Sequence, residues 1–389
     1  MGRAALEELV VLDFSRILAG PLATMLLGDY GATVIKVERP GSGDDTRSWS
    51  PPRDASGTAT YFLAVNRNKR SVALDLADPA ELEAARELAV RADVVVENFR
   101  PGVMERLGLD YPRLRERAPG LIYCSITGFG AGAGARMPGY DLLVQALGGL
   151  MSITGSPDSE PQKVGVALVD VIAGLFAATG ILAALRHRDA TEEGQLIEVD
   201  LLSAVLAALA NQASAYTAAD VVPRRMGNAH PSIAPYELLA TAAGDLVVAV
   251  GNDRQFADLC RVLDAPELPD DPRFTTNDAR VENRDELRDL LERRLARAPA
   301  ADWVEPLLAA GVPAGEVNDV EGAFGLAARL GLDPIVEVAG DGRSVRLPRN
   351  PVRMSATPPH YAAPPPPLGE LGVEAALELA AAARGSGDG

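Results

Sequence analysis

A single carboxyl side chain interrupts a long apolar run. Between positions 164 and 185 the chain reads VGVALVDVIAGLFAATGILAAL, and Asp170 is its one charged residue. Removing an ionised carboxylate from water costs several kcal/mol unless it is paired, and otherwise the group becomes neutral by raising its pKa. A desolvated carboxylate is also a better nucleophile than a hydrated one, as covalent catalysis by aspartate requires. Asp170 is therefore the candidate nucleophile.

Three other interpretations of this carboxyl group remain open. An acid near the start of a helix complements the positive end of the helix dipole. A core helix can also carry an acid that pairs with an arginine distant in the sequence. A membrane span is the third, since the run exceeds about 18 residues. The early acid, the glycines at positions 165, 174 and 180 and the lack of a second such run argue against it.

Size and charge limit what the chain binds. Its 389 residues can bury a large core and predict two domains. Hydrophobic residues make up 47% and charged residues 23%, as in an ordinary globular protein. The formal net charge of -17 disfavours nucleic acid and anionic membranes as partners. An anionic small molecule remains compatible with this charge if arginines gather locally.

The remaining composition predicts a cytoplasmic protein without a metal site. Cys124 and Cys260 are too few for a disulfide framework or a zinc site, and the three histidines are scattered. The N-terminal MGRAALEELVVLDF lacks a basic region followed by an apolar block and a cleavage site, so we expect no signal peptide. We also expect no prosthetic group.

The elements that must position Asp170 follow an α/β pattern. The first half alternates β-branched runs with helical segments, which predicts a mostly parallel, doubly wound sheet. We expect strands at 9–14, 33–37, 71–74, 93–97, 121–126 and 196–200, and helices at 21–30, 79–92, 139–150 and 167–186. The loop 40–60 is rich in Gly, Ser, Pro and Asp and is too long for a plain connector, so we expect it to be functional.

The second half predicts a smaller α+β unit. A hairpin is expected at 236–240 and 246–250, with helices at 253–263, 283–296 and 301–309. Strands at 335–338 and 344–347 lead to the proline-rich TPPHYAAPPPPLGE, which predicts an extended strap lying over another surface. We expect the last residues, 383–389, to be disordered.

The second predicted strand delivers charged residues to the edge of the sheet where ligands bind. Lys36, Glu38 and Arg39 lie at its C-terminal end, and Arg47 follows in the loop. Arg39 and Arg47 are placed to hold phosphate bidentately, although surface ion pairs explain them equally well. The usual dinucleotide fingerprint, the P-loop and the GxSxG elbow are all missing.

Collinear motifs extend over most of the chain. They are LAGP, VIKVERPGSGDDTR, NRNKRSVALDL, ADVVVENFRPGVMERLGL, IYCSITGFG, PGYDLLVQALGGLMSITG, VGVALVDVIAGLFAATGILAAL and PPPPLGE. Together they resemble the class III CoA-transferase family, which includes formyl-CoA transferases and alpha-methylacyl-CoA racemases, and the similarity runs from about Leu6 to Glu370. Through SRILAGP, GSGDDTRSW, YCSITGFG, MGNAHPSIAPYELL and GNDRQFADLC the chain looks most similar to the succinyl-CoA dependent dicarboxylate transferases of the succinate-hydroxymethylglutarate type.

The resemblance implies a mechanism for Asp170. The carboxylate attacks the thioester of an acyl-CoA to give a mixed anhydride, and the released CoA thiolate then forms an aspartyl-CoA thioester. An acceptor carboxylic acid, here expected to be dicarboxylic, reverses these steps. The alternative within the family is a racemase or epimerase in which Asp170 acts as acid and base. The racemases have a histidine where this chain has Tyr140, and a tyrosine is a poor base at neutral pH.

The resemblance also assigns binding residues. Phe99 is expected to lie against the adenine, and Arg39, Arg106 and Arg136 are expected to offset the CoA phosphates. The other implied CoA contacts are Leu18, Ala19, Leu74, Asp75, Asn98, Tyr140 and Asp141. The implied substrate-binding residues are Arg16, His230, Tyr236, Gly251 and Asn252. His230 is equally well explained as a loop histidine fixed by neighbouring backbone.

The family's architecture sets the remaining expectations. A large CoA-binding α/β domain spans 1–220 and is completed by 330–389, and a small α+β domain spans 226–325. Two chains are expected to interlock as a homodimer. Acyl-CoA and a carboxylic acid are the expected small-molecule partners, with no nucleic acid and no membrane.

Overall fold

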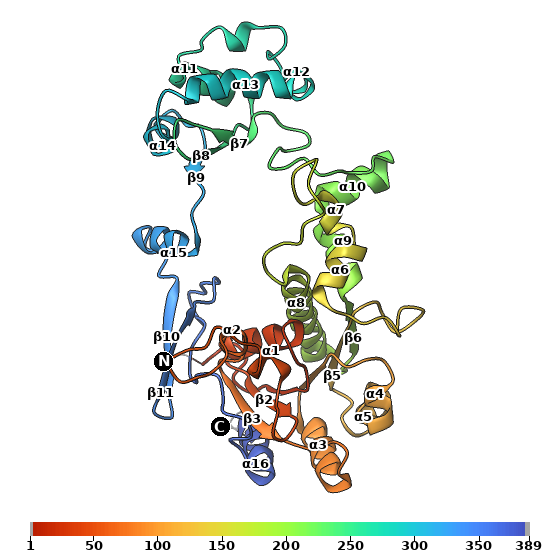
Figure 1. Ribbon diagram of the computed structural model, residues 1–389. Helices are drawn as coiled ribbons and strands as arrows, with labels where there is room; N and C mark the ends of the chain where they lie inside the picture. Colours follow the sequence, from red (N-terminus) through yellow and green to blue (C-terminus); the bar gives the residue numbers. More distant parts are fainter. Residues whose placement is uncertain (1–2, 386–389) are drawn as a thin grey trace. The chain divides into compact units, whose positions relative to one another are not determined.

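The computed structural model describes residues 3–385, and residues 10–200 contain the strands of a six-stranded parallel sheet (Figure 1). The strand order is β3-β2-β1-β4-β5-β6, which is the doubly wound order of dinucleotide-binding folds. The strands are β1 (Val10–Asp13), β2 (Thr33–Glu38), β3 (Lys69–Ala73), β4 (Val94–Glu97), β5 (Ile122–Thr127) and β6 (Leu196–Asp200). All six predicted strands and the α/β fold are confirmed.

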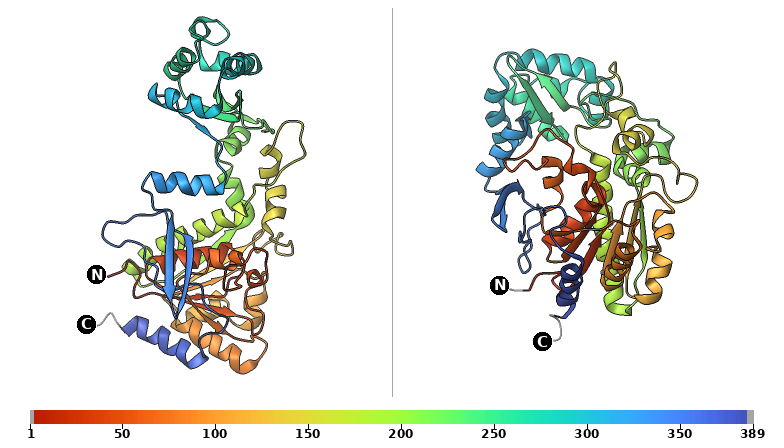
Figure 2. Two further views of the ribbon diagram at one scale, coloured as in Figure 1. Left: turned by 60° about the vertical axis from the view of Figure 1, so that its left-hand side comes forward. Right: turned by 60° about the horizontal axis from the view of Figure 1, so that its bottom comes forward.

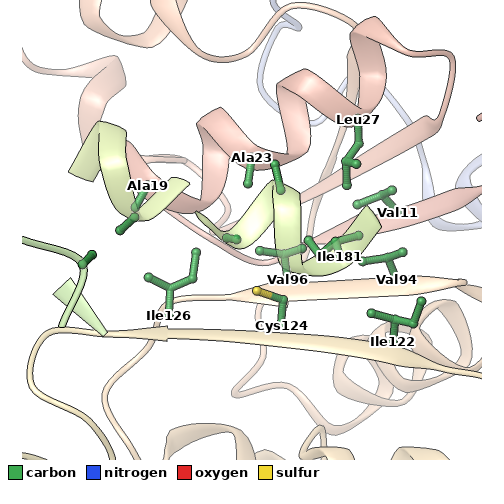
Figure 3. Packing of buried hydrophobic residues seen from close by; sticks show 14 of the residues in the cluster. Val11, Ala19, Ala23, Leu27, Val94, Val96, Ile122, Cys124, Ile126 and Ile181 are labelled. Carbon is green, nitrogen blue, oxygen red and sulfur yellow. The ribbon is translucent and has the colours of Figure 1, made fainter. Parts of the chain in front are cut away.

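Helices cover both faces of this sheet, which explains why its two central strands, β1 (VVLD) and β4 (VVVE), are buried throughout and largely apolar. On β4, Val94 and Val96 enter one buried cluster and Val95 enters the other. The first cluster packs under α1 (Ala19–Asp29), α8 (Leu168–Thr191) and α9 (Leu201–Ala208), as Figure 3 shows for α1 and α8. The second packs against α3 (Pro79–Arg91), α5 (Tyr111–Arg117) and α16 (Val373–Gly385).

The helix that carries Asp170 packs closely on the first helix of the chain. A Cβ added at Gly174 of α8 would lie 2.6 Å from the carbonyl oxygen of Ala19, so only glycine permits this approach. Among residues 3–385, α8 is the one helix long and apolar enough to cross a membrane, by length and composition alone. Core helices pass the same test, and Ala173, Ala177 and Ile181 of α8 are buried against the sheet.

Several short helices escape a periodicity-based prediction. The predicted helix 139–150 is divided into α6 (Asp141–Leu147) and α7 (Leu150–Ile153), because Gly149 adopts a φ of 84° that ends a helix. Other helices that were not predicted include α2 (Thr60–Ala64), α4 (Val103–Leu107), α10 (Ala210–Ala219) and a 3₁₀ turn at Asp45–Arg47, as well as α5, α9, α12 (Asn277–Glu282) and α15 (Val320–Arg329).

The proline-rich strap is extended, as predicted, and lies over the β3 side of the sheet. It follows the hairpin of β10 (Ile335–Gly340) and β11 (Arg343–Pro348). Asn68 donates from its side chain to the carbonyl of His360, and the carboxylate of Glu370 pairs with Arg70 at 2.7 Å. Leu371 then bridges to Val72 of β3.

The C-terminal helix corrects the prediction of a disordered tail. Residues 383–385 form the last turn of α16, and residues 386–389 of that prediction lie outside the described part of the chain. The helix packs beside α3, as both views of Figure 2 show, and buries Ala376 and Ala380.

The chain divides into two compact units, and residues 151–162 group with the second. The second unit also contains 221–332 and has its own sheet, β7 (Tyr236–Ala240), β8 (Asp245–Ala249) and β9 (Ala314–Glu316), so the predicted hairpin is confirmed. Its helices are α11 (Asp253–Val262), α12 (Asn277–Glu282), α13 (Arg284–Leu295), α14 (Ala300–Ala309) and α15 (Val320–Arg329), with a 3₁₀ turn at Leu268–Asp270. Leu246, Phe256 and Leu291 are buried in its core.

Candidate active site

A large cavity opens at the carboxyl edge of the parallel sheet, where the strand order reverses between β1 and β4. Ligands bind at this point in doubly wound sheets because neighbouring connections leave to opposite faces. The cavity has a volume of about 860 Å³. Its wall includes Asp170 together with six of the predicted CoA contacts, namely Leu18, Ala19, Asn98, Phe99, Tyr140 and Asp141.

Asp170 is the third residue of α8 and is partly buried. Burial raises the pKa of its carboxyl group from 3.8 to about 7, and the negative charge of Asp141 adds to the rise. Within residues 3–385 it forms no ion pair, so the interpretation of an acid held by a distant arginine does not apply. A site at the start of a helix favours the ionised form and opposes this rise. With a pKa of about 7, a substantial fraction of Asp170 is ionised at neutral pH.

Asp141 holds the start of this helix from a neighbouring element. Asp141 is the first residue of α6, and its Oδ1 accepts hydrogen bonds from the backbone N–H groups of Val169 at 2.8 Å and Asp170 at 3.3 Å. These are two of the N–H groups that a helix start leaves without partners. The carboxylate thus caps α8 across the fold, in addition to lining the cavity as the resemblance implies.

Gln145 completes this arrangement, although the sequence analysis did not single it out. The side chain is fully buried. Its Nε2 donates to Asp141 Oδ2 at 2.6 Å and to the carbonyl of Val166 at 3.3 Å, while its Oε1 accepts from the N–H of Val164 at 2.9 Å. One amide therefore fixes the segment before α8 to the residue that caps α8. A polar residue four positions after Asp141 inside the apolar LLVQAL was the available signal.

The turn between β1 and α1 is held in a strained form beside the cavity. Ile17 has a φ of 71°, which is costly for a β-branched residue. The side chain of Asn98 secures the preceding residue, since it accepts from the N–H of Arg16 at 2.8 Å and donates to its carbonyl at 2.7 Å. Asp44 accepts from the N–H of Ile17 at 3.3 Å. Asn98 is thus committed to shaping the turn that presents Leu18 and Ala19.

The long loop 40–60 and the helix after it supply an aromatic wall that the sequence analysis missed. Trp49 and Tyr61 both line the cavity, and their rings meet edge to face with centroids 5.2 Å apart. Burial raises the pKa of Tyr61 to about 12, and the charges of Asp170 and Asp141 add to this rise. Its hydroxyl is therefore a hydrogen-bond donor at neutral pH.

A second cavity of about 240 Å³ gathers the residues expected to hold the nucleotide. Its walls include Arg39, Leu74, Asp75 and Arg16, and Phe99 lines both cavities. Arg16 had been assigned to the acyl group, but its guanidinium lies over the Phe99 ring at 5.2 Å, on this second cavity. The predicted Arg106 and Arg136 line neither of these two cavities.

Buried ion pairs fix the strands behind these cavities. Lys69 Nζ contacts Asp13 at 3.0 Å and Lys36 Nζ contacts Asp44 at 3.0 Å, and all four side chains are fully or almost fully buried. Arg47 pairs with Glu38 at 2.6 Å and donates to the carbonyl of Pro366 in the strap. The ion-pair interpretation therefore applies to Arg47 in place of the phosphate role, because its guanidinium is bonded to Glu38 at the end of β2 and to the strap.

The remaining predicted substrate residues lie together in the second unit. The rings of His230 and Tyr236 have centroids 5.3 Å apart, and His230 Nδ1 accepts from the N–H of Ser232 at 3.1 Å. Asn252 caps α11 by accepting from the N–H of Gln255 at 3.0 Å, and the N–H of Gly251 donates to Gln255 at 2.8 Å. The backbone contact fits the interpretation of His230 as a fixed loop histidine, and its substrate role stays a prediction.

Metal ligands are not gathered anywhere in the described chain. No group of three or more His, Cys, Asp or Glu side chains within residues 3–385 is placed to hold a metal ion. Both cysteines are buried.

The sequence model of CoA-transferase family III matches residues 6–371, which is nearly the whole chain. The chain belongs to this family. It is 43% identical to the succinate–glutarate CoA-transferase of Agrobacterium fabrum, with 96% of this chain and 95% of that protein covered. It is 40% identical to the acetyl-CoA:oxalate CoA-transferase of Acetobacter aceti, with 96% of each covered.

A solved structure shows the same family fold. The crystal structure of a CAIB/BAIF family protein from Brucella suis superposes with a TM-score of 0.86 at 43% identity, and covers 97% of this chain and 100% of that one. The resemblance found in the motifs is thereby confirmed, and the protein is a CoA-transferase of class III.

Proposed function

We propose that this CoA-transferase moves CoA from succinyl-CoA, or a similar dicarboxylyl-CoA, to a dicarboxylic acid, with Asp170 as the covalent carrier. The observation that carries the proposal is the position of Asp170 at a helix start, in a large cavity at the strand-order reversal, with no cation of residues 3–385 paired to it. The names of relatives support the substrates, since they include succinyl-CoA:glutarate and succinyl-CoA:mesaconate CoA-transferases.

The first half of the reaction needs only an ionised Asp170. A carboxylate oxygen attacks the thioester carbonyl, the C–S bond breaks, and the electron pair leaves with the CoA thiolate. The product is a mixed anhydride between Asp170 and the acyl group. The thiolate then attacks the aspartyl carbonyl and expels the acid as its carboxylate, which leaves an aspartyl-CoA thioester. No net proton is exchanged, so a carboxylate with a pKa near 7 serves without a general base.

The second half repeats these steps with the acceptor. Its carboxylate attacks the aspartyl-CoA thioester, and the thiolate then attacks the acceptor's carbonyl in the new anhydride. The new acyl-CoA leaves and the Asp170 carboxylate is regenerated. Since one thioester replaces another, the fold has to hold the thiolate and orient the carboxylates more than it has to supply driving force.

The two cavities suit the two ends of an acyl-CoA. Arg16 and Arg39 are the arginines on the wall of the smaller cavity, and each pairs with Asp45, at 3.1 and 3.6 Å, so a CoA phosphate has to compete with that carboxylate for them. Phe99 lies at the junction of the cavities, so a ligand with its nucleotide end against Phe99 extends toward Asp170. Leu18, Ala19 and Tyr140 line the path between.

The cavity favours a transferase over a racemase. A racemase needs a second proton-transfer group opposite Asp170, and no histidine is among the residues of the described chain that line the cavity. Tyr140 occupies the relevant wall, and its side chain is 61% exposed. Deuterium exchange at the α-carbon of an acyl-CoA, without an acceptor acid, distinguishes the two activities.

Substitution of Asp170 tests the covalent mechanism. The wild-type enzyme incubated with succinyl-CoA should show a CoA adduct by intact-protein mass spectrometry, and hydroxylamine should remove it. Asp170→Asn should form no adduct and should lose turnover with every acceptor acid. Unchanged turnover in Asp170→Asn would reject the proposal, as would a wild-type enzyme that yields no new CoA ester from any carboxylic acid.

We also propose that the chain works as a homodimer. Apolar side chains on the outer surfaces of α8 and α9 are exposed in the single chain, including Leu175, Phe176 and Leu206 at 47–49%. Large apolar side chains exposed on two helices that pack together, as α8 and α9 do, are typical of an interaction site. Light scattering coupled to gel filtration should give twice the mass of the 40.8 kDa chain, and a monomeric mass would overturn the proposal.

A further inference from the structure

The use of lysine in this chain is unusual and points to one position. Of the 37 basic residues only three are lysines, and every other cation is an arginine. Lys36 and Lys69 are fully buried in ion pairs behind the sheet. Lys163 is the single exposed lysine, and it lies on the wall of the cavity that contains Asp170.

The backbone that carries Lys163 is fixed relative to the nucleophile. The next residue, Val164, donates its N–H to Gln145, and Gln145 in turn donates to Asp141. Asp141 accepts from the N–H of Asp170. Two side chains, those of Gln145 and Asp141, therefore connect the lysine segment to the start of α8.

The Lys163 ammonium forms few interactions with the rest of the described chain. Its one hydrogen bond is to the carbonyl of Val164 at 3.3 Å, and it forms no ion pair with any carboxylate of residues 3–385. Most arginines of the chain are committed to nearby acids or carbonyls, as Arg47 and Arg67 illustrate. Lys163 is thus a cation on the cavity wall that has no carboxylate partner among residues 3–385.

The substrate chemistry supplies a use for it. When a dicarboxylic acid forms a CoA thioester, its second carboxylate stays free and enters the cavity with the acyl group. The wall already contains the acids Asp141 and Asp170, and it is otherwise largely apolar. An unpaired carboxylate is strongly disfavoured there. The cations on the wall are Lys163 and Arg100, and Arg100 directly follows Phe99, on the side proposed for CoA.

We propose that Lys163 binds the free carboxylate of the dicarboxylyl group and so selects dicarboxylic over monocarboxylic substrates. This inference rests on the proposed transferase function and names the specificity of that same site. A compact ammonium on a flexible four-carbon stem follows acyl chains of different length better than a planar guanidinium does. The segment fixed by Gln145 sets where that stem begins.

A matched pair of thioesters tests the proposal. Succinyl-CoA and butyryl-CoA differ by a carboxylate in place of a methyl group, so the ratio of their kcat/KM values isolates the contribution of the free carboxylate. Lys163→Met should lower this ratio by about 10- to 100-fold, as expected for loss of one charge-assisted hydrogen bond. Lys163→Arg should restore part of it. Arg100→Met should change both substrates alike and leave the ratio as in the wild type.

Chemical labelling gives a second measurement that does not depend on turnover. In the Asp170→Asn enzyme, trinitrobenzenesulfonate should label Lys163, because the other two lysines are buried. Succinyl-CoA should slow this labelling, whereas butyryl-CoA should not, as followed by peptide mass spectrometry.

The outcomes separate the two proposals. A wild-type enzyme that forms no CoA ester of any dicarboxylic acid would reject the function itself. A wild-type enzyme that does form them, together with an unchanged succinyl-to-butyryl ratio in Lys163→Met, would overturn the role of Lys163 alone. Equal protection of Lys163 by both thioesters would overturn it as well.

Discussion

The ionisation of Asp170 should govern how the reaction depends on pH. Its pKa is about 7 in the folded protein, compared with 3.8 for an ordinary aspartate, because of burial and the charge of Asp141. Attack requires the carboxylate, so activity should rise as pH increases through 7. About a tenth of the enzyme is ionised at pH 6 and about nine tenths at pH 8. The kcat/KM for succinyl-CoA should therefore increase about tenfold between these values and then level off.

Asp141→Asn tests the cause of this pKa. Burial is the larger of the two causes, so the charge of Asp141 accounts for less than half of the difference between 3.8 and about 7. Removing that charge should move the midpoint to lower pH by about one unit. The asparagine oxygen can still cap α8, but its amide nitrogen would face Gln145 Nε2, which should lower the plateau without moving the midpoint.

The assay is kcat/KM for succinyl-CoA from about pH 5.5 to 9, which reports the free enzyme. Asp189→Asn is the matched control, since Asp189 lies on the same helix about 28 Å from Asp170 along the axis. Its midpoint should equal that of the wild type. A wild-type profile that is flat, or an Asp141→Asn midpoint at or above the wild-type value, would refute this account of the electrostatics.

The other predictions concern the residues that support the site. Gln145→Met leaves the N–H of Val164 and the Asp141 carboxylate without their partner, so kcat should fall about 10- to 100-fold with a smaller change in KM, and unchanged kcat would contradict the positioning role. Arg67→Ala leaves the fully buried Asp29 carboxylate without its bidentate partner, so urea denaturation should show a loss of about 3–5 kcal/mol in the free energy of unfolding. Arg91→Ala, which breaks an exposed pair at 3.7 Å, should change it by less than about 0.5 kcal/mol, and equal losses in both variants would contradict this.

Local patterns in the sequence were enough for the framework of the fold. The strands are short runs that contain β-branched residues, and the central ones are recognisable from a few adjacent residues because they are buried on both faces. The candidate nucleophile was visible in the same way, because one acid in an apolar run has to be accounted for wherever the run folds. Short helices such as α2 and α4 were missed, since five residues carry too little periodicity to be recognised.

The use of individual side chains was decided only by contacts between distant segments. Arg47 appeared available for phosphate until the structure showed it bonded to Glu38 and to Pro366, which is 319 positions away. Arg16 belongs to the smaller cavity because the Asn98 side chain fixes its backbone and Phe99 lies beneath its guanidinium. A charged residue looks the same in the sequence whether its side chain is paired or free. Its partners are known only from the folded structure.

The sequence by itself determined a mostly parallel sheet and a lone carboxyl group near the start of an apolar helix, because strand formation, helix formation and burial depend on neighbouring residues. The tertiary structure alone decided how that carboxyl group is tuned and supported. Asp141 and Gln145 on α6 control the start of α8, and Tyr61 comes from an element more than a hundred residues earlier. Electrostatic and hydrogen-bonding effects depend on distances in space, and these distances cannot be derived from the spacing of residues along the chain.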